Sequence, residues 1–486
     1  MFLIKKKTGF FVHQLFFVLP IFFCFSFVQA QECELTREKT LHLMEQNNLQ
    51  TQITHYQMEK SEYDAEYAKA IYDQQLAFGA NHTLDKSDRI VSFMGTKDEI
   101  TSFSARYQKA FPTGTLFSTG LRTTRQFNNG PFTTVNPAFN TIANFSIQQP
   151  LLNNAFGQGY RQDVAMAQML SDSQTMQLQR TQQQISLEAL FQYWDWIAKK
   201  MDLVLIQEAT QRAQDFVKIT GKQFQYGTSE NTDVYAAKSN HLSQVEDQTR
   251  AENDVAISFN TLVNTLRLQD LPTKSCQSLD LQRLYTKVDY TLLSNVEKAQ
   301  ASRTDRKALE KSLEAFELKI KRSKNQNQPD LNLLASLDLN AVNTDWDSSV
   351  GETFSSYHPK WFVGAELVVP LEKRRQKAEW AQAQLDEKIA KTQLQQLDLD
   401  LYQSISNKVI ALQSLEKRIE AIAEVVEFEQ KKLVSAKRNY ELGRQTALTV
   451  ILYQQDLIRV HRKKLALELE YRLTLEELNF IRGELQ

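Results

Sequence analysis

The feature that most constrains this fold is a very long segment with almost nothing that ends a helix. From Leu371 to Arg482 the chain contains one glycine, Gly443, and no proline. The whole chain of 486 residues has only 14 glycines and 9 prolines, well below ordinary usage. Few turns and long uninterrupted elements are therefore expected.

The apolar residues of this segment advance by three and four positions in alternation, which is the spacing of a coiled coil. The only polar residue in the series is Glu429. The series is Leu412, Leu415, Ile419, Ile422, Val426, Glu429, Leu433, Ala436 and Tyr440. This pattern predicts a helix from about Lys373 to Leu442, which would be on the order of 100 Å long at 1.5 Å per residue. The segment from Tyr160 to Tyr226 predicts a second helix of similar length.

Gly443 has a counterpart in the first half of the chain, which indicates an internal repeat. Residues 439–451 read NYELGRQTALTVI, and residues 223–235 read QFQYGTSENTDVY, with Gly227 at the matching position. A glycine just past a helix adopts the left-handed conformation at little cost. We therefore predict that each glycine ends a long helix at a reversal, with Thr232, Asp233 and Thr446 as candidate caps of the returning helices. A glycine tolerated inside a continuous helix is the alternative.

Two prolines mark the ends of strands, and their separation along the chain is close to that of the two glycines. Pro150 follows NFSIQQ and Pro370 follows GAELVV, and each ends a stretch in which apolar and polar residues alternate. Strict alternation is typical of a strand with one apolar and one wet face. Four strands are predicted in this way, at about 115–127, 139–149, 330–342 and 360–370. The segment from Thr101 to Phe111 is predicted to be an additional extended segment in the periplasm.

The chain is predicted to divide into three parts. Residues 1–30 have basic residues, an apolar run and a small-residue cleavage site, so they resemble a secretory signal peptide, with a retained membrane anchor as the alternative. Residues 31–271 and 272–486 form the two repeats. Cys33 and Cys276 lie near the start of the two repeats and can pair in an oxidising compartment, or both can remain thiols.

Composition and motifs exclude several classes of protein. The net charge of -1 gives no reason to expect nucleic acid as a partner, and a mean hydropathy of -0.45 argues against a bundle of membrane-spanning helices. The histidines are scattered, and no phosphate loop, nucleophile elbow or CxxC occurs. We therefore expect no catalysis, no metal and no cofactor. The aromatic cluster FQYWDW at 191–196 is interpreted as helix packing.

Four amphipathic strands cannot close a membrane barrel, because such barrels begin at about eight strands. Unpaired strand edges cannot face lipid either. Two copies of the chain would provide eight strands and three copies would provide twelve, which is wide enough for an aqueous channel. The strands therefore predict an oligomer.

With these features the sequence resembles the TolC family of outer-membrane efflux proteins over essentially the whole mature chain. The resemblance is carried by the doubled helix–strand–strand–helix plan, the strand exits QQPLLNN and VPLEKR, and the two glycine turns. It implies a mainly helical fold with a β-barrel part: a homotrimer with a twelve-stranded outer-membrane barrel and a long helical tunnel in the periplasm. It also implies a passive exit duct for efflux or type I secretion, which docks a periplasmic adaptor and an inner-membrane pump or ABC transporter.

The resemblance also assigns roles to particular residues. The matched turns Tyr226-Gly227-Thr228 and Leu442-Gly443-Arg444 correspond to the tips that would meet the adaptor. Some members have acidic residues at the tunnel entrance six and nine positions after the second glycine, where this chain has Thr449 and Leu452. Asp233, six residues after the first glycine, is either an entrance residue or a plain helix cap.

Two basic clusters flank the strands of the second repeat, at 319–324 and 373–377. In the proposed topology both lie at the periplasmic edge of the barrel, where the heads of outer-membrane lipid would attract them. Solvated helix ends are the alternative. Two other kinds of protein compete with a duct: a periplasmic adaptor, which usually has a single helical hairpin, and a fibrous coiled-coil protein, which gives no reason for strands with alternating faces.

Overall fold

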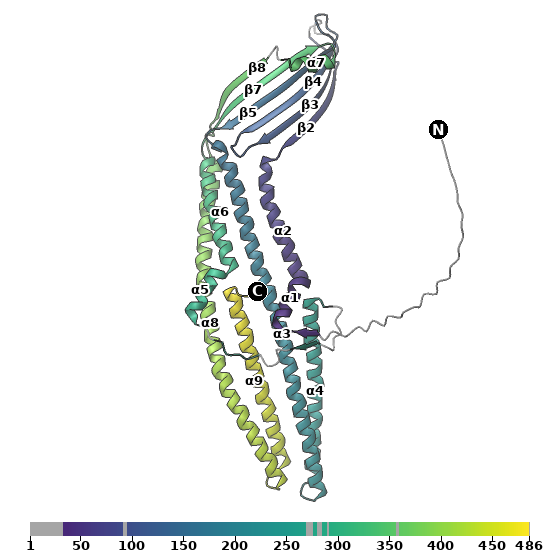
Figure 1. Cartoon of the computed structure of the whole chain (residues 1–486), viewed down its shortest axis with the longest axis vertical. Coiled ribbons are helices and arrows are strands. Elements are labelled where there is room, and N and C mark those ends of the chain that lie inside the picture. The colour runs from purple at the N-terminus through teal and green to yellow at the C-terminus, as the bar shows by residue number, and fades with distance from the viewer. Residues whose placement is uncertain are drawn as a thin grey trace, which may run out of the picture.

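A computed structural model describes residues 33–90, 95–268, 276–278, 284–288, 291–355 and 359–485. The predicted signal peptide at 1–30 and the predicted repeat boundary at 271–272 lie outside the described residues. The chain forms an elongated molecule with a sheet at one end and long helices that run away from it (Figure 1). Helices account for most of the residues.

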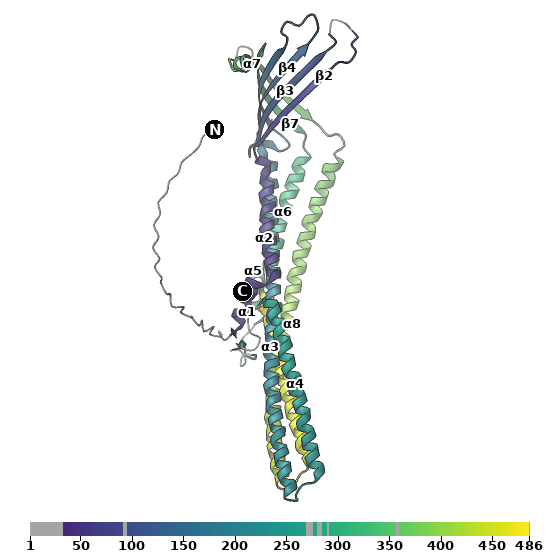
Figure 2. The same ribbon diagram turned by 90° about the vertical axis from the view of Figure 1, so that its right-hand side faces the viewer.

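Two helical hairpins run through the molecule and have the same helix lengths. Helix α3 (Gln158–Gln225) has 68 residues and α4 (Asn231–Leu266) has 36. Helix α8 (Arg374–Glu441) again has 68 residues and α9 (Ala447–Arg482) has 36. The two long helices predicted from the sequence are therefore confirmed to within a few residues. Both hairpin turns lie at the end of the molecule opposite the sheet in both views (Figures 1 and 2).

Shorter helices complete the half of the molecule next to the sheet. There α2 (Leu49–Lys69) packs on α3, and α6 (Thr304–Gln326) packs on both α3 and α8. In the other half, α4 packs on α3, α3 on α9 and α9 on α8. Consequently each half is a layer of four helices, and only α3 and α8 belong to both.

The remaining short elements are gathered near the middle of the long axis, where α2 begins and α9 ends (Figure 1). They are α1 (Arg37–Asn47), α5 (Leu292–Ser302) and a small parallel sheet of β1 (Cys33–Leu35) with β6 (Cys276–Ser278). Tyr193, Trp194 and Trp196 of α3 are buried here against α1, α4 and α9. The interpretation of the FQYWDW cluster as helix packing is confirmed.

The heptad series of α8 faces α9 as its spacing predicts. Seven of its members are buried: Leu412, Leu415, Ile419, Ile422, Leu433, Ala436 and Tyr440. The polar member Glu429 forms an ion pair with Lys432 of the same helix, and the Lys432 Nζ atom also lies 3.4 Å from Asp456 of α9. At the one polar position of the heptad series, Lys432 thus links Glu429 of α8 to Asp456 of α9 through ionic contacts.

The sheet contains six strands among the described residues, not the four that the sequence analysis predicted. The strands are antiparallel in the order β2-β3-β4-β5-β7-β8. Their bounds are β2 Gln75–Asp85, β3 Asp98–Ala110, β4 Leu116–Asn128, β5 Ala138–Pro150, β7 Asp330–Asn343 and β8 Pro359–Val368. Strands β4, β5, β7 and β8 match the four predicted ranges, β2 was not predicted, and β3 was assigned wrongly.

Strand β3 covers the segment that was expected to lie outside the barrel as an extra extended piece. It pairs along its whole length with β4, from Asp98 opposite Asn128 to Ala110 opposite Leu116. A tight turn at 112–115 joins the two strands at the end of the sheet that faces the helices. Relative to a plan of two strands per repeat, β2 and β3 are therefore the additional strands of the first repeat.

The hairpin of β3 and β4 is fixed to the start of α3. Gly114 in its turn and Gly157, the residue before α3, both have positive φ values, of 77° and 75°. The two backbones approach so closely that a Cβ atom on either glycine would overlap the other segment. The Arg161 Nη1 atom donates to the Pro112 carbonyl oxygen at 2.6 Å, and the Gln149 Nε2 atom donates to the Thr113 carbonyl oxygen at 3.0 Å.

Helix α7 (Trp346–Thr353) lies between β7 and β8 in the chain and folds back onto the sheet at the end far from the long helices (Figure 1). Asp345 caps it by accepting from the Ser348 backbone N–H at 2.9 Å. The Ser349 hydroxyl donates to Thr141 Oγ1 of β5 at 2.8 Å. Two short 3-10 turns, η1 (Ala70–Tyr72) and η3 (Ala155–Gly157), join the helices to the sheet.

Candidate functional site

The two hairpin turns, which we call the tips, have the same backbone geometry. In the first, Gly227 has a φ of 73°, its N–H donates to the Phe224 carbonyl at 3.0 Å, and the Thr228 N–H donates to the Gln223 carbonyl at 3.0 Å. This pair of bonds is the Schellman pattern that satisfies the last carbonyl groups of a helix.

The second tip repeats this pattern residue by residue. Gly443 has a φ of 69°, its N–H donates to the Tyr440 carbonyl at 2.9 Å, and the Arg444 N–H donates to the Asn439 carbonyl at 2.8 Å. A Cβ atom added at Gly227 or at Gly443 would meet no atom within 4 Å. Backbone conformation, and not space, is therefore the reason for glycine at both tips.

The two tips also lie against each other. The Gln223 Nε2 atom donates to the Glu441 carbonyl oxygen at 3.1 Å, and the hydroxyls of Ser229 and Tyr440 are 3.2 Å apart. The ring of Tyr440 packs on that of Phe216, with centroids 5.2 Å apart. The tips therefore form one surface built from both halves of the chain.

That surface exposes apolar side chains. Tyr226 and Leu442 occupy the C-cap positions of α3 and α8. Tyr226 is 80% exposed and Leu442 is 56% exposed. Gly227, Thr228, Gly443 and Arg444 are exposed as well. An exposed aromatic and aliphatic group at a rigid helix end can bind another protein, because burying it removes apolar surface from water.

The candidate entrance residues lie just inside the tips. Asp233 is in the first turn of α4, but the N-cap position is Glu230, so Asp233 is not the cap residue. The Asp233 carboxylate accepts from the Ser229 hydroxyl at 3.0 Å. The hydroxyl of Thr449 lies 3.0 Å from that of Thr446, and the Leu452 side chain is 49% exposed. Thr446 occupies the N-cap position of α9 without a side-chain capping bond.

The two prolines lie where strands give way to helices. Pro150 is the last residue of β5 and pairs with Asn332, and α3 begins eight residues later. Pro370 follows β8 by two residues, and α8 begins at Arg374. Lys373 precedes that helix with a φ of 50°, and its Nζ atom donates to the Asn327 carbonyl at 2.9 Å.

The strand register gives the sheet one apolar and one polar face. The apolar face is contributed by alternate residues of all six strands. Large side chains on it include Leu76, Phe78, Phe103, Tyr107, Phe117, Leu121, Phe139, Phe145, Ile147, Leu333, Leu337, Leu339, Trp361, Val363 and Leu367. Many of them are exposed in the single chain. An apolar face of this extent indicates contact with lipid or with another protein.

The opposite face is mostly polar and carries hydroxyl, amide and charged side chains. It includes Asn81, Ser102, Ser104, Arg106, Gln108, Ser118, Arg122, Thr124, Asn140, Asn144, Ser146, Ser336, Asp338, Asn340, Lys360 and Glu366. Ser118 and Ser146 are bonded across the strands at 2.6 Å, and Asp338 accepts from the Asn144 amide. A polar face of this kind can border a water-filled space.

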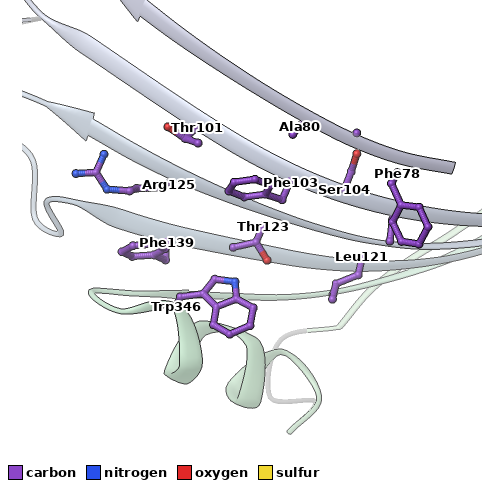
Figure 3. Close-up of a pocket in the computed structure, with 12 residues that line it drawn as sticks. Phe78, Ala80, Thr101, Phe103, Ser104, Leu121, Thr123, Arg125, Phe139 and Trp346 are labelled. Carbon is purple, nitrogen blue, oxygen red and sulfur yellow. The ribbon is translucent and has the colours of Figure 1, made fainter. Parts of the chain in front are cut away.

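A pocket of about 710 Å³ lies on the apolar face beside α7. Figure 3 shows Phe78, Phe103 and Phe139 along it and Trp346 of α7 beside the strands. The one charged group in its lining is Arg125, whose Nη1 atom lies 3.4 Å from Glu99 Oε1. The pocket can bury hydrocarbon, but its lining offers no carboxylate, thiol or imidazole for catalysis.

Cys33 and Cys276 are opposite each other in the register of the small parallel sheet of β1 and β6. Adjacent strands are about 4.8 Å apart, and a disulfide usually joins Cα atoms about 4.4–6.8 Å apart. The register is thus compatible with the predicted disulfide. The bond stays a prediction that mass spectrometry of the non-reduced protein tests.

The basic clusters next to the sheet are largely engaged in polar contacts within the chain. Lys319 pairs with Asp386 at 2.8 Å, Arg322 with Asp163 at 3.1 Å and Arg375 with Glu379 at 2.8 Å. The side chains of Arg374 and Arg375 are nevertheless 85% and 86% exposed. The second cluster therefore keeps cationic surface available at the junction of sheet and helices.

A buried ion cluster ties the start of the described chain to the middle of the molecule. The fully buried Glu476 of α9 accepts two bonds of 2.9 Å from Arg37 of α1, and its Oε1 atom lies 3.2 Å from the Trp194 indole nitrogen. Arg472 Nη2 lies 3.1 Å from the same carboxylate.

Two opposing effects act on the pKa of Glu476. Burial raises this pKa, but the hydrogen-bonded guanidinium of Arg37, together with Arg472 and the Trp194 N–H, holds the pKa below its ordinary value. The contacts are all internal, so the cluster is structural and offers no site for a ligand.

Among the described residues, no group of three or more histidine, cysteine, aspartate or glutamate side chains is placed to hold a metal ion. Within the same part of the chain, every helix falls short of the combination of length and apolarity needed to cross a membrane.

Sequence reasoning missed β2 and the charged residues that β3 adds to the polar face. The signal for β2 was present, because Leu76, Phe78, Ala80 and Leu84 alternate with other residues in QLAFGANHTLD. In contrast, Arg106 and Arg122 become neighbours only once β3 and β4 are paired, so no local pattern could have joined them.

The sequence by itself matches no protein-family model and no curated protein. Solved structures of outer-membrane channels do match the fold. The chain is 14% identical to CusC, with a TM-score of 0.68 and coverage of 92% of both chains. It is 15% identical to the outer-membrane protein VceC of Vibrio cholerae, with a TM-score of 0.65 over 92% of this chain and 96% of that one.

The open-state outer-membrane channel MtrE of Neisseria gonorrhoeae is also similar, with 14% identity and a TM-score of 0.67 over 93% of this chain and 89% of that one. At identities this low the likeness concerns the fold. The chain therefore has the fold of these channels. The mainly helical architecture with one antiparallel sheet that the resemblance to the TolC family implied is confirmed, whereas the twelve-stranded trimeric barrel stays a prediction.

Proposed function

We propose that this chain belongs to the TolC family and forms, as a homotrimer, a passive outer-membrane exit duct for efflux or type I secretion. In this proposal the sheet lies in the outer membrane and the helices extend through the periplasm. The tips dock a periplasmic adaptor, which connects the duct to an inner-membrane pump or ABC transporter.

The observation that carries the proposal is a two-faced sheet with two open edges. Within the described residues, β2 and β8 are each paired on one side only. An unpaired edge cannot lie in lipid, because each unsatisfied backbone group costs several kcal/mol there. If other copies of the chain pair with β2 and β8, both edges disappear, the apolar face is turned to lipid and the polar face lines water.

The helical layer has matching open edges, on α2 next to β2 and on α8 next to β8. The exposed edge of α2 carries apolar side chains at spacings of three and four: Leu49, Ile53, Tyr56, Tyr63 and Tyr67. The exposed side of α8 carries Leu385, Ile389, Leu399 and Ile410. Because such stripes are typical of helices that pack against a partner, a second copy of this chain is the occupant that continues both the sheet and the helical layer.

Six strands per chain change the size of the assembly. Three copies of six strands would provide eighteen strands, in place of the twelve that the resemblance implies. Barrel diameter grows with strand number, and barrels of 16–18 strands hold an aqueous channel. The periplasmic wall would still contain four helices per copy at each level, so we propose a sheet region that is wide relative to the tunnel below it.

Cell fractionation combined with single-channel recording in planar bilayers tests this function. We expect the protein in the outer-membrane fraction and stepwise conductance from the purified assembly. A water-soluble periplasmic monomer, as expected for an adaptor, or an outer-membrane protein that never conducts would contradict the proposal.

A further inference from the structure

The polar face of the sheet places its cations in one band. Two neighbouring rows of the strand register run across the sheet at mid-height. One row contains Arg106, Gly120, Asn144, Asp338 and Lys360, and the next contains Gly79, Ser104, Arg122, Ile142 and Asn340. We call the four charged residues of these rows, Arg106, Arg122, Asp338 and Lys360, the central band.

The cations of the central band have no ionic partner among the described residues. Arg106 and Arg122 are exposed and make no side-chain hydrogen bond or ion pair within that part of the chain. Asp338 accepts from the neutral Asn144 amide, and no cation lies within ion-pair distance of it among the described residues. The band thus carries three positive charges against one negative charge per chain.

The backbone leaves the two arginines uncovered. Gly120 lies directly opposite Arg106, and Gly79 lies opposite Ser104, which in turn is opposite Arg122. With no side chain at either glycine, a hollow of about 400 Å³ forms on the sheet, and Arg106, Arg122 and Asp338 line it. Arg106 and Arg122 therefore both border this hollow.

The carboxylates of the polar face lie mostly near the strand ends, away from this band. Glu366 is six residues along β8 from Lys360, which is about 20 Å at 3.3 Å per residue. At the other end, Asp85 is held by Ser87 and Arg89, and Asp98 accepts from the Gln126 amide. The Debye length at physiological salt is about 8 Å, so these groups are largely screened from the band.

We propose that the central band makes the duct anion-selective and suits it to anionic cargo. The inference rests on the proposed function, because it requires the polar face to line the channel. In a trimer the band becomes a ring with nine cations and three carboxylates. Rings of arginine and lysine select anions, since they raise the local concentration of negative ions and exclude positive ones.

Two of the three cations in each chain come from the hairpin of β3 and β4. Arg106 lies on β3, one of the two strands beyond the four predicted, whereas Arg122 lies on β4. Without β2 and β3 the band would still contain Arg122, Lys360 and Asp338, with a net charge of +1 per chain in place of +2. The additional strands β2 and β3 therefore double the net positive charge of the band and widen the sheet region as well.

The reversal potential of single channels across a potassium chloride gradient tests this inference. We expect chloride to be preferred in the wild-type protein and the chloride-to-potassium permeability ratio to fall severalfold, to one or below, in the double variant Arg106→Gln/Arg122→Gln. Arg125→Gln is the matched control, because Arg125 is on β4 but on the apolar face and pairs with Glu99. This control should keep the wild-type ratio.

The outcomes separate the two proposals. A double variant that conducts with an unchanged permeability ratio, or a wild-type channel that prefers potassium, would overturn the anion selectivity and leave the duct intact. A wild-type protein that makes no channel would overturn the proposed function, and this inference with it.

Discussion

At the scale of single residues, the junction between α3 and the hairpin of β3 and β4 depends on two glycines. Gly157 has a φ of 75°, and a Cβ atom on it would overlap the Pro112 carbonyl oxygen. Gly157→Ala combines left-handed strain of about 1–2 kcal/mol with a steric clash of about 1–3 kcal/mol. We expect it to lower the thermal unfolding midpoint of the detergent-solubilised protein by several degrees.

Gly221→Ala is the control for this substitution. Gly221 lies inside α3, and an added Cβ atom would meet no atom within 4 Å. Alanine in a helix interior is favoured by about 1 kcal/mol over glycine, so this variant should be at least as stable as the wild type. Equal stability of both variants would show that the hairpin is not fixed to α3 as described.

The buried Glu476 predicts a pH dependence of stability. Its pKa is lower in the folded chain than in the unfolded chain, so its contribution is fully present above the unfolded pKa of about 4.5 and is lost as the pH falls through the folded value. Glu476→Gln leaves Arg37 without its charged partner and should cost about 3 kcal/mol at pH 7. The unfolding midpoints of variant and wild type should converge as the pH is lowered below 4.

Glu470→Gln, also on α9, removes an exposed carboxylate that lies 3.9 Å from Arg418. Exposed ion pairs contribute little to the free energy of unfolding. This control should therefore unfold within about a degree or two of the wild type both at pH 7 and at pH 3. A gap between Glu476→Gln and wild type that stays constant from pH 7 to pH 3 would contradict the ionic role of Glu476.

At the scale of elements, the helices were predictable and the sheet was only partly so. Long runs without glycine or proline, and the heptad series on α8, are local signals, and they located α3, α8 and both tips. Strand β3 was recognised as extended but placed outside the sheet, because alternation shows that a segment is a strand and not which strand it pairs with. The internal repeat also favoured two strands per half, so β2 was overlooked.

The candidate site was likewise predictable at the tips but not on the faces of the sheet. The tip glycines follow from helix termination alone, whereas the face on which a charged side chain lies depends on register. Arg122 and Arg125 are three residues apart on β4 and therefore lie on opposite faces of the sheet. Their different environments are visible only when the strands are paired.

The tip assignment gives a prediction for Gly443. Valine is β-branched and strongly disfavoured at a φ of 69°, so Gly443→Val should distort the turn without any clash. We expect transport by the complete complex in cells to be impaired, while bilayer conductance of the purified variant stays normal. Gly221→Val, inside α3 and equally free of contacts, is the control and should transport like the wild type. Unimpaired transport by Gly443→Val would argue against docking at the tips.

At the scale of the whole molecule, a single chain has open edges along its entire length. Among the described elements these are β2, α2 and α4 on one side and β8 and α8 on the other. The sheet adds six strands per copy, while the helical layer adds four helices at each level. A closed ring of copies would satisfy both edges at once, and in the function that we propose the conducting pathway is then a property of the assembly.

Electron cryomicroscopy of the protein extracted from outer membranes tests this most directly. We predict a ring of three copies in which β2 of each copy pairs with β8 of the next, so that eighteen strands surround a water-filled space with Arg106 and Arg122 facing inward. A folded single copy with both edges free, or a closed sheet from which β2 and β3 are excluded, would contradict the account.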